Sequence, residues 1–376
     1  MKKNIITLAT LIVAVLALSA SALAQNSLTT ATNAKPSQAI VSSLSNLPDA
    51  DEILYISPHR ILADAAPRVL PDADLAKMRT GLGDMKKETG VDPSNIDYLV
   101  MQVRFKKPTA ELNFSLPEFL LVAGGDFSAE SILVLIRQAA KGKLREETYG
   151  SRTIILLTID EIAKEAQKNA FLKPLSEIAI ASIGGNTIAA GTPAYVRAAL
   201  DAADGKGRIN SDILNSLMRD PAVLMSTAGS PMLAFAKTFA LLGTENNPRP
   251  SRCESKLGDF YAGVTMAATS FRLRGAMNAD NPDTAKIIKS LLSSLLQQAT
   301  SSIKDPQAQS VLSSLVITPT DTEVLVQADI SQQAVADFIR EQTKPKKQEV
   351  SKPAPPKPPT KRRHRRIRRT PPKSGM

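Results

Sequence analysis

The fold is indicated most clearly by residues 261–282, whose sequence is YAGVTMAATSFRLRGAMNADNP. Two apolar runs, residues 261–266 and 271–277, flank the short stretch Ala268-Thr269-Ser270, as the two strands of a β-hairpin flank their turn. Asn281 then precedes Pro282, which pairs an N-cap residue with proline at the first helical position. The stretch therefore predicts a hairpin that is followed directly by a helix.

The same turn and capping signals recur along the chain. Gly184-Gly185-Asn186 separates two apolar runs, and Thr318-Pro319-Thr320-Asp321 separates residues 315–317 from residues 323–327. Both stretches predict further hairpins. Helix starts are indicated by residues of the N-cap type, four of them directly before proline, and one of them opens a capping box. These residues are Ser57, Ser128, Thr158, Thr192, Ser230, Asn281 and Ser331.

Hairpins that alternate with helices predict an α+β fold, with a largely antiparallel sheet and helices on one face. A doubly wound, Rossmann-like arrangement is the alternative. Residues 51–204 read β-α-ββ-α-β-α-ββ-α, and residues 221–340 read β-α-ββ-α-ββ-α. The two strings match if one βα unit near residues 144–170 is an insertion. The order of elements is thus consistent with two tandem copies of a β-α-ββ-α-ββ-α module.

The first 24 residues have the three parts of a secretory signal peptide. Lys2 and Lys3 are followed by an apolar run over residues 5–18 and by the small residues Ala22-Leu23-Ala24. A membrane anchor is the alternative, but about 14 apolar residues are fewer than the roughly 20 that span a bilayer. We therefore expect cleavage before Gln25, export to the periplasm or the extracellular space, and no transmembrane segment in the mature chain.

Changes in composition divide the mature chain into segments. Residues 25–49 are rich in Ser, Thr, Asn and Ala and predict a flexible lead-in. Residues 50–204 and 221–342 are expected to form two α+β modules, with residues 205–220 as their connection. Residues 343–376 contain eight prolines and two large apolar side chains before the final Met376, so they predict a disordered Pro-rich tail.

Positive charge is concentrated in this tail. Residues 343–376 hold thirteen Lys or Arg and one acid, a net charge of +12, whereas the whole chain carries +11. The rest of the chain is therefore at −1, and removal of Lys2 and Lys3 with the leader brings the mature body near −3. A basic surface on the folded body, as a nucleic-acid-binding domain would have, is not implied by the overall charge.

Seven of the tail's cations lie within nine residues. In an exported protein, such a run points to an anionic envelope polymer or lipid surface as its partner. A solubilising chain end without any partner is the alternative. The expected polyanion-binding residues are Lys361, Arg362, Arg363, Arg365, Arg366, Arg368 and Arg369.

Local signals for catalysis are missing from the sequence. Cys253 is the only cysteine, and the two histidines, His59 and His364, are both far from it along the chain. No G-x-S-x-G, S-x-x-K, H-E-x-x-H or C-x-x-C motif occurs. We expect a protein that is not an enzyme and needs no metal or cofactor. The alternative is a hydrolase-like exported enzyme with a cleft that no local motif marks.

Two further patterns have simple structural interpretations. Gly124-Gly125 precedes Asp126 and lacks the lysine or third glycine of a phosphate loop, so it predicts a turn and a helix cap. The helix from Pro282 carries an apolar stripe, which usually means core packing; a face for a partner protein or for a second copy of the chain is the alternative. Its residues are Ile287, Ile288, Leu291, Leu292, Leu295, Leu296 and Ala299.

The chain resembles exported bacterial proteins of unknown function that have a repeated α+β body. The resemblance rests on the order of elements and on the stretches LGDFYA (residues 257–262) and GAMNADNP (residues 275–282). The resemblance covers roughly residues 50–340, implies an exported α+β body and brings no catalytic residues. The expectation is therefore an exported, non-enzymatic binding or interaction protein of the bacterial envelope. Its basic tail would tether it to anionic surfaces, and its folded body could contact a protein partner or another copy.

Overall fold

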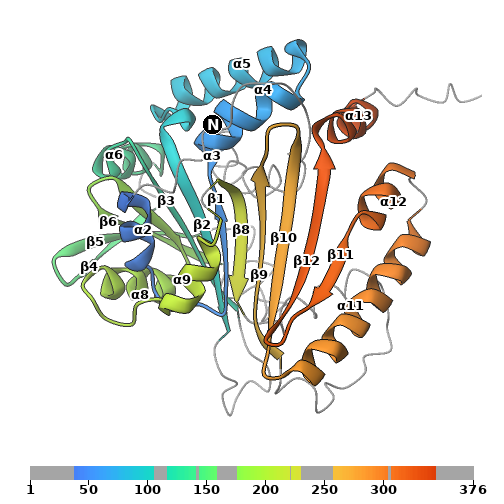
Figure 1. Cartoon of the computed structure of the whole chain (residues 1–376). Helices are drawn as coiled ribbons and strands as arrows, with labels where there is room; N and C mark the ends of the chain where they lie inside the picture. Colours follow the sequence, from blue (N-terminus) through green and yellow to red (C-terminus); the bar gives the residue numbers. More distant parts are fainter. Residues whose placement is uncertain are drawn as a thin grey trace, which may run out of the picture.

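The computed structural model describes residues 38–105, 117–140, 144–158, 176–220, 222–229, 257–303 and 306–343. Its centre is one sheet of twelve strands, every neighbouring pair of which is antiparallel (Figure 1). Helices surround this sheet, so the fold is α+β with a large antiparallel sheet, as the sequence predicts.

The strands follow one another along the sheet in the order β11-β12-β10-β9-β8-β1-β2-β3-β7-β6-β5-β4. Those of the first part of the chain are β1 (Glu52–Ile56), β2 (Ile96–Phe105), β3 (Pro117–Gly125), β4 (Leu144–Tyr149), β5 (Arg152–Thr158), β6 (Glu177–Gly184) and β7 (Thr187–Gly191). Those of the second part are β8 (Val223–Gly229), β9 (Leu257–Met266), β10 (Ser270–Ala279), β11 (Val316–Pro319) and β12 (Glu323–Ser331).

The described helices lie before, between and after these strands. The short helical turns after β1 are α3 (Pro58–Arg60), a π-helix (Ile61–Ala65), α4 (Ala66–Val69) and, before β2, a 3-10 turn (Pro93–Asn95). The longer helices are α2 (Gln38–Ser45), α5 (Asp72–Thr89), α6 (Ala129–Ala140), α8 (Pro193–Ala203), α9 (Ser211–Leu217), α11 (Pro282–Ser302), α12 (Pro306–Ser313) and α13 (Gln332–Thr343).

All three predicted hairpins are present. β9 pairs with β10 across residues 267–269, and Phe271 lies opposite Met266. β6 pairs with β7 across Gly185 and Asn186, and β11 pairs with β12 across the turn that follows Pro319. Turn residues thus specified correctly which consecutive strands are neighbours.

The helices occupy both faces of the sheet, which differs from the expectation of one covered face. In β5, Ile154 and Leu156 pack in a core with α2, α8 and α9, whereas Ile155 packs with α6 on the opposite face. The physical reason is that residues 154–156 are apolar at every position, so this strand has two faces to bury. We call the face under α2, α8 and α9 face A, and the opposite one face B.

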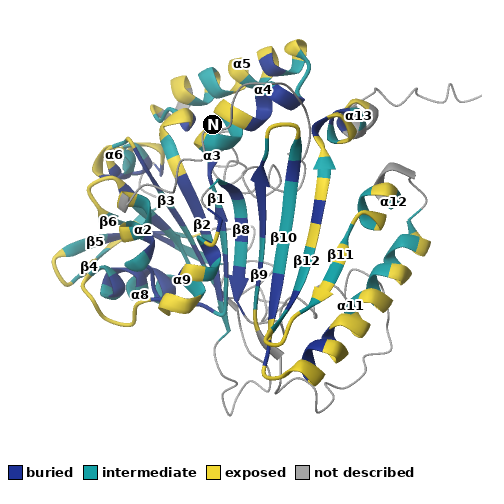
Figure 2. Ribbon diagram, viewed as in Figure 1, coloured by how far each residue is buried: buried dark blue, intermediate teal, exposed yellow. Residues whose placement is uncertain are grey.

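Face B carries three separate groups of buried side chains. One lies under the segment from Ile61 to Val69 and includes Leu224, Val264 and Phe271. A second lies under α6, and a third lies under α11, where Ala285 and Ile288 pack on Met277 and Val324. Figure 2 shows the same arrangement: burial is greatest along the central strands, and the outer sides of the helices are exposed.

Two segments are more structured than the sequence indicates. Residues 38–45 form α2, and Leu44 and Leu47 are fully buried, so this part of the expected flexible lead-in belongs to the core. Within the expected connection, residues 211–217 form α9, whose Leu217 is buried. Both helices are short, and a few apolar residues fix them against face A, which is a tertiary effect that local composition does not reveal.

The two parts of the chain meet at the pair β1·β8. Here Glu52 lies opposite Gly229 and Ile56 opposite Met225. Outward from this pair the sheet continues as β2-β3-β7-β6 on one side and as β9-β10-β12-β11 on the other, with β5 and β4 beyond β6. The order of pairing is therefore the same on both sides, while a duplication of the module stays a prediction.

Candidate functional site

The polyanion-binding residues expected in the tail, Lys361, Arg362, Arg363, Arg365, Arg366, Arg368 and Arg369, lie outside the described residues, as do Cys253 and the first 24 residues. The structure therefore brings none of these predicted features together. What it does describe is the folded body, on which two hollows, a polar strip and an apolar helix edge are candidates for function.

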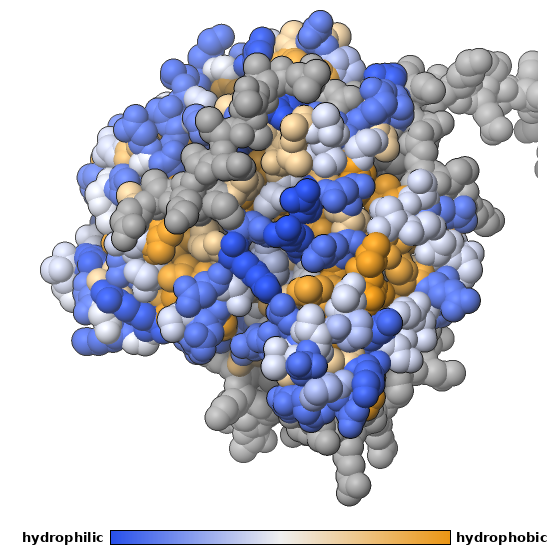
Figure 3. Space-filling model, viewed as in Figure 1, coloured by the Kyte–Doolittle hydropathy of each residue, from blue (hydrophilic) through white to orange (hydrophobic). Residues whose placement is uncertain are grey.

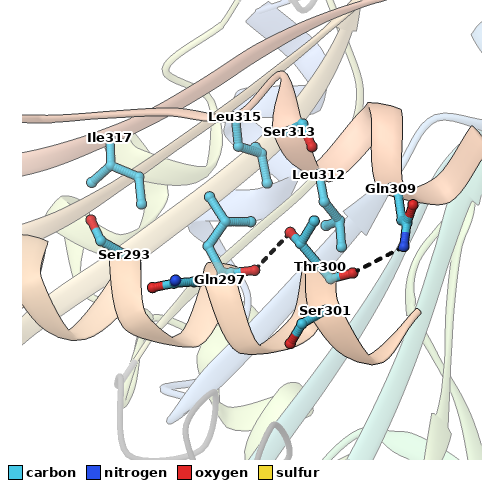
Figure 4. Close-up of a pocket in the computed structure, with 10 residues that line it drawn as sticks. Ser293, Gln297, Thr300, Ser301, Gln309, Leu312, Ser313, Leu315 and Ile317 are labelled. Carbon is cyan, nitrogen blue, oxygen red and sulfur yellow. Dashed lines mark hydrogen bonds between the residues drawn. The ribbon is translucent and has the colours of Figure 1, made fainter. Parts of the chain in front are cut away.

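The larger hollow lies between α11, α12 and β11 and has a volume of about 630 Å³. Figure 4 shows side chains from all three elements pointing toward one another across it. Leu296, Leu312, Leu315 and Ile317 give it an apolar lining, and Ser, Thr and Gln side chains complete the wall. On the space-filling surface, hydrophobic area appears beside β11, between β12 and the two helices (Figure 3).

The polar groups of this hollow bond mainly to nearby backbone. The Thr300 hydroxyl donates to the carbonyl oxygen of Leu296 at 2.8 Å, and the Gln309 amide donates to the carbonyl oxygens of Thr300 and Ile303. None of the ten lining residues is charged. The hollow therefore suits an uncharged, partly apolar surface better than an ionic ligand.

The apolar stripe of α11 is buried only in part. Ile288 is 1% exposed and Leu292 packs against the same group, which confirms core packing for that side of the helix. Ile287 is 61% exposed and Leu291 40% exposed. The sequence could not distinguish these positions, because a stripe this wide does not show which part of it meets the sheet.

A polar strip crosses face A over β9, β10 and β12. The Tyr261 hydroxyl donates to Asp220 Oδ2 at 2.6 Å, and Arg274 donates to Asp220 Oδ1 at 3.2 Å. Burial, together with this bond to Asp220, raises the pKa of Tyr261. Hydrophilic side chains accordingly gather in the middle of the face seen in Figure 3.

Two further ion pairs belong to the same strip. Arg219 donates to both oxygens of Glu323, at 3.1 and 3.2 Å, and this bonding raises the pKa of Arg219. Arg272 pairs with Asp329 on the neighbouring strand at 3.0 Å. Acids and bases therefore balance one another along the strip, so it has no excess charge with which to attract an ion.

Many other arginines of the described ranges are paired in the same way. At least nine lie within 4.0 Å of a carboxylate, and Arg104 also stacks over the Tyr195 ring at 4.4 Å. Their positive charge is thus compensated locally. These nine are Arg104, Arg137, Arg145, Arg152, Arg197, Arg219, Arg272, Arg274 and Arg340.

The smaller hollow, of about 400 Å³, is polar and lies between α6, the β4–β5 turn and β6. Arg137 lines it and donates to Glu130 at 3.0 Å and to Glu146 at 2.8 Å. These bonds raise the pKa of Arg137. Arg137 thus forms ion pairs with one carboxylate of α6 and one of β4 beside this hollow.

Gly124-Gly125 has a packing role. Both residues lie at the end of β3, where a Cβ on Gly124 would lie 2.3 Å from the Tyr98 ring and one on Gly125 would lie 2.0 Å from the Asn95 carbonyl oxygen. Ser128 Oγ accepts from the Ser131 amide at 3.2 Å and so caps α6. The two glycines thus let the end of β3 lie close to Tyr98 and Asn95, just before the capped helix α6. This agrees with a structural role for the two glycines.

Two features are absent from the described residues. Their His, Cys, Asp and Glu side chains form no group of three or more that could hold a metal ion. None of the helices in these ranges combines the length and the apolar character needed to cross a membrane.

Comparison with known proteins does not place the chain in a family. No protein-family model and no curated protein matches the chain. Among solved structures, crystal forms I, III and IV of TP0453 are similar at 11% sequence identity, with TM-scores of 0.40, 0.41 and 0.40. Each alignment covers 79% of this chain and 95–97% of the other.

Proposed function

We propose that this chain is an exported, non-enzymatic binding protein of the bacterial envelope, tethered to an anionic surface by its C-terminal tail. The observation that carries the proposal is the run of seven cations between Lys361 and Arg369. An anionic polymer or lipid head groups would bind such a run mainly by electrostatic attraction, with release of condensed counterions.

The charge of the folded body supports a tether confined to the tail. Nine arginines of the described ranges are already paired with carboxylates, and residues 1–342 carry a net charge of −1. Attraction to a polyanion would therefore depend on residues 343–376. The body would be held near the surface without being flattened against it.

The hollow between α11, α12 and β11 is the part of the body best suited to a second partner. It is open, uncharged and lined by Leu and Ile side chains from three elements. Shallow apolar surfaces of this kind are typical of protein contacts. A hydrolase would need charged or nucleophilic groups directed into a closed cleft. The ten residues that line this hollow are all uncharged.

The tail is tested with duplex DNA as a model polyanion. If about seven cations engage, a plot of the logarithm of affinity against the logarithm of salt concentration should have a slope near −6. Replacing Arg362, Arg363, Arg365 and Arg366 with Gln should flatten that slope by about four. The matched control replaces the same four residues with Lys, which keeps the charge and should leave the slope unchanged.

Binding that is insensitive to salt, or that survives the four Gln replacements, would refute the tether. Export is tested separately by N-terminal sequencing of protein from the envelope fraction. We expect a mature chain that begins at Gln25, whereas an intact Met1 would contradict export.

We also infer that the body consists of two related modules joined at β1·β8. The order of strand pairing outward from this pair, β2-β3-β7-β6 and β9-β10-β12-β11, supports this inference. A chain that begins at Asp220 and is expressed together with residues 38–219 should reconstitute the sheet. Failure of the two pieces to associate would argue against two modules.

A further inference from the structure

The sheet ends on one side at β11, which among the described residues pairs only with β12 (Figure 1). A strand at such an edge presents backbone N–H and C=O groups on its outer side. The strand at the opposite end, β4, has the sequence LREETY with three charges, whereas β11 has the uncharged sequence VITP. Because charge discourages pairing with another strand, β11 is the edge better suited to it.

The other half of the sheet continues further at the equivalent place. Outward from β1 the strands run β2-β3-β7-β6, and β5 then pairs with β6. Outward from β8 the described strands run β9-β10-β12 and end at β11. Helix α6 follows β3 just as α11 follows β10. The place that β5 fills beside β6 therefore has no counterpart among the described strands beside β11.

In the first half, β5 contributes a side chain to the group under α6. Ile155 of β5 lies opposite Ile180 of β6, and both are buried in that group. In the second half, Ile317 of β11 packs against the group under α11. The described members of that group include no side chain from beyond β11.

The hollow between α11, α12 and β11 lies where that missing side chain would be. Ile317 lines the hollow, as does Leu315 two residues earlier, and both are seen at its wall in Figure 4. Directly opposed residues of two paired strands point to the same face of a sheet. A residue paired with Ile317 would therefore point into the hollow, as Ile155 points to α6 beside Ile180.

The surroundings of β11 specify the chemistry of a strand that could pair with it. The hollow has a volume of about 630 Å³ and ten uncharged lining residues. Val316, which lies opposite Gln327 on the other face, is 61% exposed and would be covered by an apolar neighbour. Pro319 has no N–H to donate, so pairing is confined to the residues before it.

We propose that β11 is the docking edge for an extended, uncharged segment of another protein, which adds a strand to the sheet and places alternate aliphatic side chains in the hollow. Backbone hydrogen bonds would supply affinity, and the hollow would supply selectivity. This assignment rests on the binding role proposed above but not on the tail. A second copy of the chain is a poorer occupant, because its β4 is charged and its β11 already has α11 beside it.

The docking is tested with the full mature chain and a fluorescent peptide that has the sequence of β5, RTIILLT. The peptide should bind, and its affinity should hardly change with salt, because the hollow offers no charge. A control peptide carries proline in place of the fourth residue. It lacks a backbone donor and should not bind.

Two variants of α11 form a matched pair. Gln297 and Gln298 are both exposed, but only Gln297 lines the hollow. Gln297→Arg places a charge where the aliphatic side chains would be buried and should weaken peptide binding by about tenfold or more. Gln298→Arg carries the same charge on the same helix and should leave the affinity unchanged.

Amide hydrogen exchange locates the bound peptide. Binding should slow exchange over residues 315–318 and leave β4 unaffected. The proposal would be overturned by absence of binding, by equal binding of the proline peptide, or by slower exchange elsewhere only. A dimer that sedimentation detects and that Gln297→Arg dissociates would also overturn it, because a second copy would then occupy β11. None of these results would alter the salt-dependent binding of the tail to DNA, so the failure of this proposal and the failure of the tether are distinguishable.

Discussion

Asp220 shows how a single carboxylate is accommodated at the edge of the core. Only 9% of the residue is exposed, and it accepts bonds from Tyr261 and Arg274. A buried charge is costly unless donors replace the water that it loses. Because Tyr261 and Arg274 come from β9 and β10, the carboxylate also fixes the start of β8 relative to those strands.

Removing one of these donors should destabilise the fold. Tyr261→Phe leaves Asp220 with one side-chain donor, so we expect a loss of about 1–3 kcal/mol in the free energy of unfolding. Urea denaturation measures this. Tyr149→Phe is the matched control, since it removes a bond to Asp201 at a less buried place and should have a smaller effect. Equal effects would contradict a special role for burial at Asp220.

The lowered pKa of Asp92 predicts how one contribution to stability depends on pH. Side-chain bonds from Lys86 and Ser94, with the Ser94 amide, lower its pKa to about 2. The folded pKa lies below the unfolded value, so this carboxylate contributes stability above roughly pH 4 and the contribution is lost as the pH falls toward 2.

A carboxyl NMR titration of Asp92 should give a midpoint near pH 2. In Lys86→Met, which removes the donor with the largest effect, the midpoint should rise toward the usual range for an aspartate. A midpoint that does not change between the two proteins would mean that Lys86 does not hold the charge.

At the scale of single elements, the capping signals differ in what they do. Asn281 Oδ1 accepts from the Thr284 amide at 2.9 Å and caps α11 directly. Thr192 also precedes a proline, but its side chain makes no capping bond; its hydroxyl instead donates to the Phe119 carbonyl oxygen at 3.4 Å. The two positions look alike in the sequence because each places a residue of the N-cap type directly before a proline.

This difference can be measured. Asn281→Ala should cost about 0.5–2 kcal/mol in the free energy of unfolding. Asn281→Ser, which keeps a side-chain acceptor, should restore most of that loss. If the Ala and Ser variants were equally destabilised, the capping bond at α11 would not be the cause.

The elements that the sequence revealed are those with local causes. Hairpins followed from turn residues, and α11 followed from Asn281, Pro282 and its apolar stripe. β4 was not expected, because its sequence LREETY has no apolar face; it is an edge strand held by pairing with β5. Its charged side chains suit an edge, since charge discourages pairing with another chain.

The arrangement of the candidate site depended on contacts that no local pattern contains. Leu296 and Leu315 could be assigned to a helix and a strand from the sequence, but the hollow between them arises from the packing of α12 on α11. The pairing of Arg219 with Glu323 joins residues 104 positions apart. Local preferences determine elements, whereas such long-range contacts are determined by the whole fold.

For the whole molecule, the critical junction is β1·β8. Gly229 has a φ of +150°, and a Cβ there would lie 2.2 Å from the Asp51 carbonyl oxygen. Gly229→Ala should therefore destabilise the protein by about 1–3 kcal/mol. Gly185→Ala is the control, because no atom lies within 4 Å of that Cβ. If urea denaturation gave the two variants the same stability, close packing at the junction would be unimportant.

The last prediction concerns where the folded body ends. α13 belongs to it, because Ala336 is 2% exposed and Ile339 8% exposed, and Val335 packs on the group under the 61–69 segment. Residues 344–376 lie outside the described residues, and because their sequence holds few apolar side chains we predict that they add little to the stability of the body. A chain that ends at Thr343 should melt within a few degrees of the full mature chain, whereas one that ends at Ser331 should melt well below it, since it exposes the surface that Ala336 and Ile339 cover. Calorimetry compares the melting temperatures of the three proteins.

A large drop in melting temperature on removing residues 344–376 alone would mean that the tail packs on the body. Its cations would then have to leave that contact before they could bind an envelope surface.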